Sequence, residues 1–136
     1  MNRWLRPVAS PAALHGWLLI LRIVVTGAML THGVPKLQKI LVGNWQFADP
    51  LGLGSELSLG LVTFAEVGCS LLIALGFLTR WAALPLLFTM LVVFFIVNAD
   101  NPFGEREVPL LYALIYATLF FTGAGKYSVD GRRNDL

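Results

Sequence analysis

Charge is scarce in this chain. Lysine, arginine, aspartate and glutamate make up 13% of its 136 residues, about half of the share found in soluble proteins. The apolar residues gather in long blocks rather than at amphipathic spacing, which excludes a soluble globular domain. The basic residues are few and the net charge is only +2, so no clustered basic face is available to bind nucleic acid. We therefore predict an integral membrane protein.

Cysteine and histidine are nearly absent as well. Cys69 is the only cysteine, so neither an internal disulfide nor a cysteine metal cluster can form within one chain. Because Cys69 lies inside an apolar block, we expect an inert small hydrophobe rather than a redox thiol. His15 and His32 are too far apart in sequence for a local metal-ligand motif. The sequence thus predicts neither a metal nor a covalent cofactor.

Four apolar blocks approach the roughly 20 residues that a helix needs to cross a bilayer. They lack the period-2 alternation of barrel strands, and no internal repeat points to an inverted-repeat transporter. Arg22 interrupts the first block, which favours a true first span over a cleaved signal peptide. We predict a single all-α domain over residues 1–136, a four-transmembrane-helix bundle. Its expected spans are residues 14–31, 57–77, 81–97 and 108–122.

The basic residues between these spans predict the orientation. Four spans place both termini on one side, and an excess of Lys and Arg marks the cytoplasmic side. We therefore expect cytoplasmic termini and an inner-membrane location. The side with the termini carries Arg3, Arg6, Arg80, Lys126, Arg132 and Arg133, and the other side carries Lys36, Lys39 and Arg106. The residues expected to anchor the interfaces are Trp4, Trp17, Trp45 and Trp81.

A long outer loop separates the first two spans, and its first half has apolar residues at helical spacing. Val34, Leu37 and Leu41 are examples. One interpretation is an amphipathic segment that lies on the outer membrane surface. The other is an extension of the first helix past a kink at Pro35. The sequence leaves both open.

Two ionisable residues lie inside the apolar blocks, Arg22 in the first span and Glu66 in the second. A charge at that depth costs roughly 2.5–3.5 kcal/mol on insertion scales, and such residues usually pair with each other. We therefore predict an Arg22–Glu66 pair. Two roles stay open for it, a functional polar pocket and a structural clamp between helices.

Other polar residues could join that pair. If Pro35 does not redirect the chain, helical spacing gives the first helix one polar stripe, which we expect to face the bundle interior and which consists of Arg22, Thr26, His32 and Lys36. Topology also brings Asp100, Glu105 and Glu107 to the outer end, near His32 and Lys36. We expect Asp100 and Glu105 to be solvated and Glu107 to be the one better placed to point inward. The expected ligand-binding residues are Arg22, His32, Lys36, Glu66, Glu107, Tyr112 and Tyr116.

Four motifs in order resemble the DoxX family of small four-helix bacterial membrane proteins. They are LRIVVTGAMLTHGVPKL, AEVGCSLLIALGFLTRWAAL, E-x-x-L-L-Y and GAGKYSVD, and they span about residues 21–130. The residues that match the family pattern are Arg22, Gly27, His32, Gly33, Lys36, Glu66, Gly76, Arg80, Glu107, Gly123, Gly125, Tyr127, Ser128 and Asp130.

The resemblance implies an association with redox membranes. One related branch is the small quinone-reducing subunit of an archaeal thiosulfate:quinone oxidoreductase, and other members sit beside thiol and oxidative-stress enzymes. The function expected here is therefore a membrane subunit of a redox complex that binds a quinone in a polar pocket. The alternative is a non-catalytic membrane scaffold or assembly partner. Either function implies contact with membrane lipid and with a protein partner or a second copy.

Overall fold

Every regular element in the described part of the chain is helical. The computed structural model describes residues 10–134, so Arg3, Trp4 and Arg6 lie outside it. The all-α prediction is confirmed for the described range. The elements are α1 (Pro11–Leu41), α2 (Ser55–Thr63), the π-helix η2 (Phe64–Cys69), α3 (Ser70–Leu75), α4 (Thr79–Val92), the π-helix η3 (Val93–Val97), α5 (Phe103–Thr122) and α6 (Val129–Asn134).

Three helical stretches are long and apolar enough to cross a membrane. They are α1, the continuous helix formed by α2, η2 and α3 (residues 55–75), and α4 with η3 (residues 79–97). The fourth predicted range falls on α5, whose first five residues include Glu105, Arg106 and Glu107. The part of α5 that follows these charges, residues 108–122, is shorter than the roughly 20 residues that cross a bilayer.

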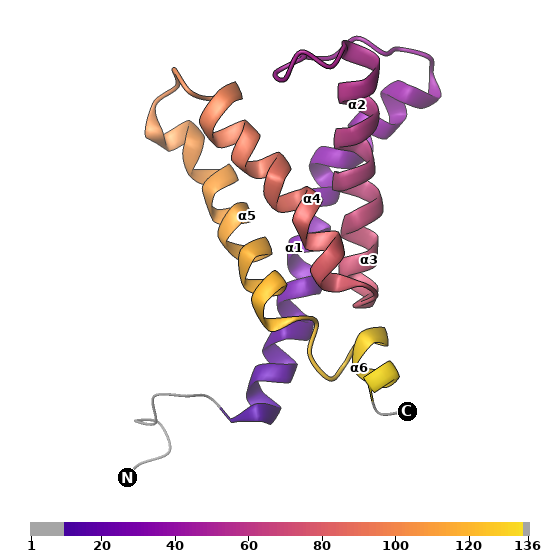
Figure 1. The fold of residues 1–136 in the computed structure, drawn as a ribbon, viewed down its shortest axis with the longest axis vertical. Coiled ribbons are helices and arrows are strands. Elements are labelled where there is room, and N and C mark those ends of the chain that lie inside the picture. Colours follow the sequence, from indigo (N-terminus) through magenta and orange to yellow (C-terminus); the bar gives the residue numbers. More distant parts are fainter. Residues whose placement is uncertain (1–9, 135–136) are drawn as a thin grey trace.

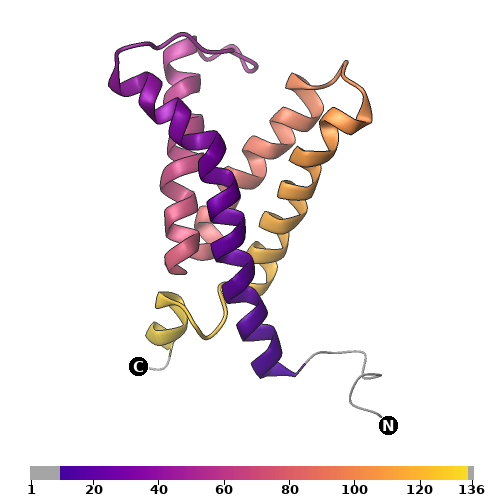
Figure 2. The ribbon, with the colours of Figure 1, turned by 180° about the vertical axis from the view of Figure 1, so that it is seen from behind.

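The helices form two arms that meet at one end. α1 packs along the helix formed by α2, η2 and α3, whereas α5 packs chiefly on α4. Figures 1 and 2 show the two arms side by side near α6 and diverging toward the opposite end. We call these the α6 end and the loop end. Because α1 begins and α5 ends beside α6, the described chain starts and finishes at the same end of the bundle.

α1 is unusually long. Ser10 caps it by accepting a hydrogen bond from the Ala13 N–H at 3.3 Å, and Pro11 occupies the first helical position, where its missing N–H costs nothing. The helix then continues through Pro35 to Leu41 and bends in its last turns (Figure 2). Its 31 residues span about 46 Å, more than the roughly 30 Å of hydrocarbon. The second interpretation of the outer loop, a helix extended past Pro35, is therefore confirmed.

The turn between α3 and α4 is tied to the tail that follows α5. Gly76 ends α3 in the left-handed region at φ +69°, and the Phe77 N–H donates back to the Leu72 carbonyl at 2.9 Å. The Asp130 carboxylate then accepts from the Leu78 and Thr79 N–H groups at 2.9 and 3.0 Å. These bonds hold α6 against the start of α4.

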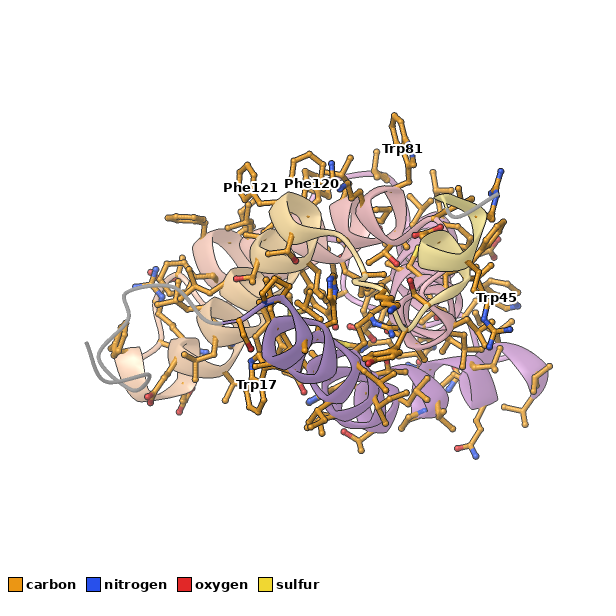
Figure 3. All side chains as sticks on the ribbon, turned by 90° about the horizontal axis from the view of Figure 1, so that it is seen from below. Trp17, Trp45, Trp81, Phe120 and Phe121 are labelled. Atoms are coloured by element: carbon orange, nitrogen blue, oxygen red, sulfur yellow. The ribbon has the colours of Figure 1, made fainter. Side chains whose placement is uncertain are left out.

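The exterior is apolar and aromatic, as lipid requires. Trp17 is 59% exposed and Trp81 is 73% exposed, and the two side chains project from opposite sides of the bundle (Figure 3). Trp45 is also exposed, in the loop after α1. The interior is built of smaller apolar residues, and those with almost no exposed surface are Met29, Leu59, Ile73, Ala83, Leu86 and Leu119.

Candidate functional site

An ion pair joins α1 to the π-helix η2. Lys36 Nζ lies 2.6 Å from Glu66 Oε2, and the Glu66 side chain is only 4% exposed. Lys36 also donates to the His32 carbonyl at 3.3 Å. Glu66 lies within η2, and π-helical turns occur frequently at functional sites. The pair brings together two of the predicted site residues.

The approach of the two helices at this pair depends on a glycine. A Cβ atom at Gly33 would lie 2.9 Å from Val67 Cγ2 and 3.0 Å from Glu66 Cβ. Only a residue without a side chain lets α1 come this close to η2. Lys36 follows Gly33 by three residues, on the same side of the helix, so its ammonium reaches the carboxylate of Glu66.

Aromatic side chains extend the site across the bundle from Glu66 to His32. The Tyr112 and Tyr116 rings are stacked, with centroids 6.2 Å apart and an angle of 15° between their planes. The His32 ring meets Tyr112 edge to face at 6.1 Å. The Glu66 carboxylate lies near enough to act electrostatically on both phenols. This cluster, which we call the polar centre, consists of His32, Lys36, Glu66, Tyr112 and Tyr116.

The polar centre contains hydroxyl groups with unused hydrogen-bonding capacity. Tyr116 is 1% exposed, yet its hydroxyl has no hydrogen-bond partner within residues 10–134. The Ser70 hydroxyl is also buried without a partner, and it lies near enough to the Tyr116 hydroxyl to be its natural hydrogen-bonding neighbour. The Ser70 carbonyl, in contrast, accepts from the Thr26 hydroxyl at 3.0 Å. An unpartnered buried hydroxyl costs free energy, so the Tyr116 hydroxyl keeps an unused donor.

The predicted Arg22–Glu66 pair is wrong. Arg22 is fully buried, but its guanidinium donates to the Ile73 and Ala74 carbonyls at 3.2 and 2.9 Å and to the Tyr127 carbonyl. The register of the two antiparallel helices explains the error. Arg22 lies opposite the end of α3, about seven residues and therefore about 10 Å along the axis from Glu66. The C-terminal carbonyls of a helix carry partial negative charge and replace the carboxylate as partner.

The predicted inward-facing stripe on α1 is confirmed only in part. Arg22 and Thr26 are buried and Lys36 is half-buried, but His32 is exposed apart from its contact with Tyr112. An α-helix turns by about 100° per residue, so His32 lies about 80° around the helix from Arg22 and does not face the bundle interior directly.

The loop acids do not join the polar centre. Asp100, Glu105 and Glu107 are exposed, and within residues 10–134 none of them forms an ion pair with Lys36 or a hydrogen bond with His32. The arms diverge at the loop end (Figure 1), which separates the start of α5 from the last turns of α1. Sharing one end of the bundle is therefore not enough to bring these groups together.

The predicted site residues leave out two contributors, Gly33 and Ser70, although Ser70 shares the helix face of Glu66. Gly33 was noticed only as part of a family pattern, and its signal is the spacing Gly33–x–x–Lys36, which places a small residue one turn before a cation. Ser70 follows Glu66 by four residues. Cys69 is buried, as predicted. Among the described residues, no three His, Cys, Asp or Glu side chains gather where they would hold a metal ion.

The fold and the polar centre together define a helical membrane protein with an ionised pair inside its bundle. The DoxX family matches residues 17–99 of the chain, and this chain therefore belongs to the DoxX family. It is also 31% identical over 127 residues to an uncharacterized protein of Haemophilus influenzae, an alignment that covers 85% of this chain and 90% of the relative. No solved structure matches it.

Proposed function

We propose that this protein is a four-span inner-membrane subunit of a redox complex, with both termini in the cytoplasm, and that the polar centre binds a quinone head group. α5 is the fourth span in this proposal, and the excess of basic residues at the α6 end supports the orientation. The observation that carries the proposal is the ion pair between half-buried Lys36 and buried Glu66, beside a tyrosine hydroxyl that has no partner among the described residues.

The residues of the polar centre suit a quinone. Its head group is a flat ring with two carbonyl acceptors, and Tyr116 offers a buried hydroxyl donor. The Lys36 side chain is 22% exposed, and its ammonium carries more than one N–H, so it can donate to a second group while it still contacts Glu66. The stacked Tyr112 and Tyr116 rings provide an aromatic surface. Donors and an aromatic surface thus occur together within the bundle.

Each residue then has a definite task. A bound quinone supplies an acceptor for two electrons and two protons. Lys36 Nζ and Tyr116 Oη orient the carbonyl groups by donating hydrogen bonds, and Glu66 Oε2 holds the Lys36 ammonium in place. His32 is exposed at the edge of the polar centre, where its ring contacts Tyr112. The electrons come from a partner protein, because side chains of this kind store none.

A binding titration tests the proposal. The purified protein in lipid nanodiscs is titrated with ubiquinone-1, and Tyr116→Phe is compared with Tyr127→Phe, which removes the same atom from an exposed ring at the α6 end. Loss of one hydrogen bond predicts about fivefold weaker binding for Tyr116→Phe. The control should bind as the parent does. Equal binding by both variants, or no saturable binding by the parent, would contradict the proposal.

A membrane scaffold is the second candidate, and the close packing at Gly33 favours it. In this case the Lys36–Glu66 pair only fixes how α1 and η2 meet. The double variant Lys36→Met/Glu66→Leu should then fold and keep its protein partner. Mass spectrometry of the protein isolated from its native membrane distinguishes the two functions. A redox enzyme with bound quinone supports the first, and a non-redox partner without quinone supports the second.

A further inference from the structure

A hollow on the described surface lies far from the polar centre, at the α6 end. Its volume is about 810 Å³, a size typical of small-molecule sites. Four elements meet there, namely the first turns of α1 and α4, the segment after α5, and α6. The proposed function makes no use of this hollow.

Three cationic side chains line the hollow. They are Arg80, Lys126 and Arg133. Within residues 10–134, none of the three forms an ion pair. Asp130 is the one carboxylate in the lining, but its two oxygens accept from the Leu78 and Thr79 N–H groups. The carboxylate therefore compensates the start of α4, and the hollow keeps an excess of positive charge.

The main chain after α5 is shaped around two of the lining side chains. A Cβ at Gly123 would lie 3.3 Å from Arg80 Nε, and a Cβ at Gly125 would lie 3.3 Å from His15 Nδ1. Both glycines have positive φ, +74° and +84°, which other residues rarely adopt. The guanidinium of Arg80 and the imidazole of His15 thus rest against backbone, which limits their freedom to move.

His15 contributes a donor to the same hollow. Its Nδ1 accepts a hydrogen bond from the Lys126 N–H at 3.0 Å. The neutral imidazole must therefore carry its proton on Nε2, where it can be donated. An anion in the hollow would meet this donor as well as the cations.

An apolar path leads from the hollow along the outside of α4. Trp81 lines the hollow and is 73% exposed, and Figure 3 shows it projecting away from the bundle. Leu84 and Phe88 follow Arg80 at intervals of four residues, so they share its side of the helix. Both are exposed, at 38% and 59%. A ligand with an anionic head and hydrocarbon chains matches this arrangement.

We propose that the hollow binds the phosphate head group of an anionic phospholipid, with its acyl chains along Leu84 and Phe88. Arg80, Lys126 and Arg133 attract the phosphate, and His15 Nε2 donates to it. Tryptophan is enriched at the depth of lipid head groups, which agrees with Trp81 at the rim. Free phosphate shares the head-group chemistry but not the apolar path, so the two sources can be separated by experiment.

Native mass spectrometry of the full chain in a neutral detergent tests this. Dioleoylphosphatidylglycerol should be retained as one molecule per chain, and dioleoylphosphatidylcholine should not. Basic residues near a membrane contribute attraction worth about fivefold in binding each. Arg80→Gln and Lys126→Gln should each lower retention by about that factor. Arg132→Gln is the matched control, since it removes the same charge from α6 but does not line the hollow.

Three results would overturn the proposal. Equal retention of both lipids shows that the charge of the head group is not recognised. An equal loss with Arg132→Gln shows a diffuse charge effect rather than a site. Displacement of phosphatidylglycerol by millimolar inorganic phosphate or glycerol 3-phosphate shows that the chains contribute nothing. Thermal unfolding of each variant confirms that it is folded, and either single variant is sufficient for the comparison.

Discussion

Gly33 on α1 and Val67 on η2 are so close that no side chain fits between them. A Cβ at Gly33 would come within 2.9 Å of Val67 Cγ2 and within 3.1 Å of the Glu66 backbone carbon. Backbone cannot move aside as the end of a flexible side chain can. This contact therefore sets the distance between the two helices at the level of the Lys36–Glu66 pair.

Gly33→Ala should destabilise the protein. Overpacking of this kind costs about 1–3 kcal/mol, and pushing α1 away from η2 should also weaken the Lys36–Glu66 contact. Thermal unfolding in detergent measures the change. Gly27→Ala is the control within the same helix, because a Cβ there meets nothing within 4 Å. Its stability should be unchanged or higher by up to about 1 kcal/mol. Equal behaviour of the two variants would show that the contact does not determine the packing.

Removing one member of the ion pair should cost more than removing both. Lys36→Met leaves the Glu66 carboxylate buried and unpaired, a situation that typically costs about 3–5 kcal/mol. Lys36→Met/Glu66→Leu removes both charges and should recover most of this stability. Unfolding of the parent, the two single variants and the double variant gives the coupling free energy. Additive effects would mean that the two charges act independently.

Arg22→Met should release the tail. The guanidinium joins the carbonyl groups that end α3 to the Tyr127 carbonyl, and its loss leaves these acceptors buried without a donor. We expect a loss of about 1–3 kcal/mol in the free energy of unfolding, the usual cost of leaving a buried acceptor without a donor.

Trypsin provides a local measurement of the same effect. Lys126, Arg132 and Arg133 lie in the tail, so cleavage there should be faster in Arg22→Met than in the parent. Tyr127→Phe keeps the carbonyl partner and should leave the rate of cleavage unchanged. An unchanged rate in Arg22→Met would contradict a role of Arg22 in fixing the tail.

The loop between α1 and α2 should depend on pH through Asp49. Its carboxylate accepts from the Gly54 N–H at 2.9 Å, the Ser58 hydroxyl at 3.0 Å and the Leu53 N–H at 2.8 Å. The hydrogen bond from Gly54 is the largest cause that lowers the pKa of Asp49, followed by those from Ser58 and Leu53. The pKa of Asp49 is lower in the folded protein than in the unfolded chain. The ionised carboxylate therefore stabilises the folded state fully above the ordinary aspartate pKa of about 3.9, and this stabilisation is lost as pH falls through the lowered pKa.

Carboxyl ¹³C shifts of aspartate-labelled protein measure this titration directly. One resonance should titrate with a midpoint below that of a model aspartate, and Asp49→Asn should remove that resonance. If the resonance assigned to Asp49 titrates with a midpoint at or above that of a model aspartate, the hydrogen bonds to its carboxylate are contradicted.

Several features could be predicted from single residues and their near neighbours. Cys69 falls in an apolar run, which predicts a small hydrophobe rather than a reactive thiol, and it is buried. Trp17 and Trp81 are exposed on the apolar exterior, as amphipathic rings at an interface should be. The fourth span stays a prediction, since the charges at Glu105 and Glu107 shorten the apolar part of α5.

The partners of the buried charges could not be predicted in this way. Arg22 and Glu66 are the central charges of their spans, and depth alone suggested that they pair. Pairing depends instead on the register of two antiparallel helices, and a shift of two turns separates the groups by about 10 Å. The continuation of α1 through Pro35 then places a nearer cation, Lys36, beside Glu66.

The sequence by itself determined the helices, their apolar character and the family, because hydrophobicity, length and motif spacing are local properties of the chain. The tertiary structure alone decided that Glu66 pairs with Lys36, that Arg22 holds the end of α3 and the tail, and that the arms diverge at the loop end. These outcomes depend on how closely helices approach, and that distance is set by packing contacts such as Gly33 against Val67, between residues far apart in the chain.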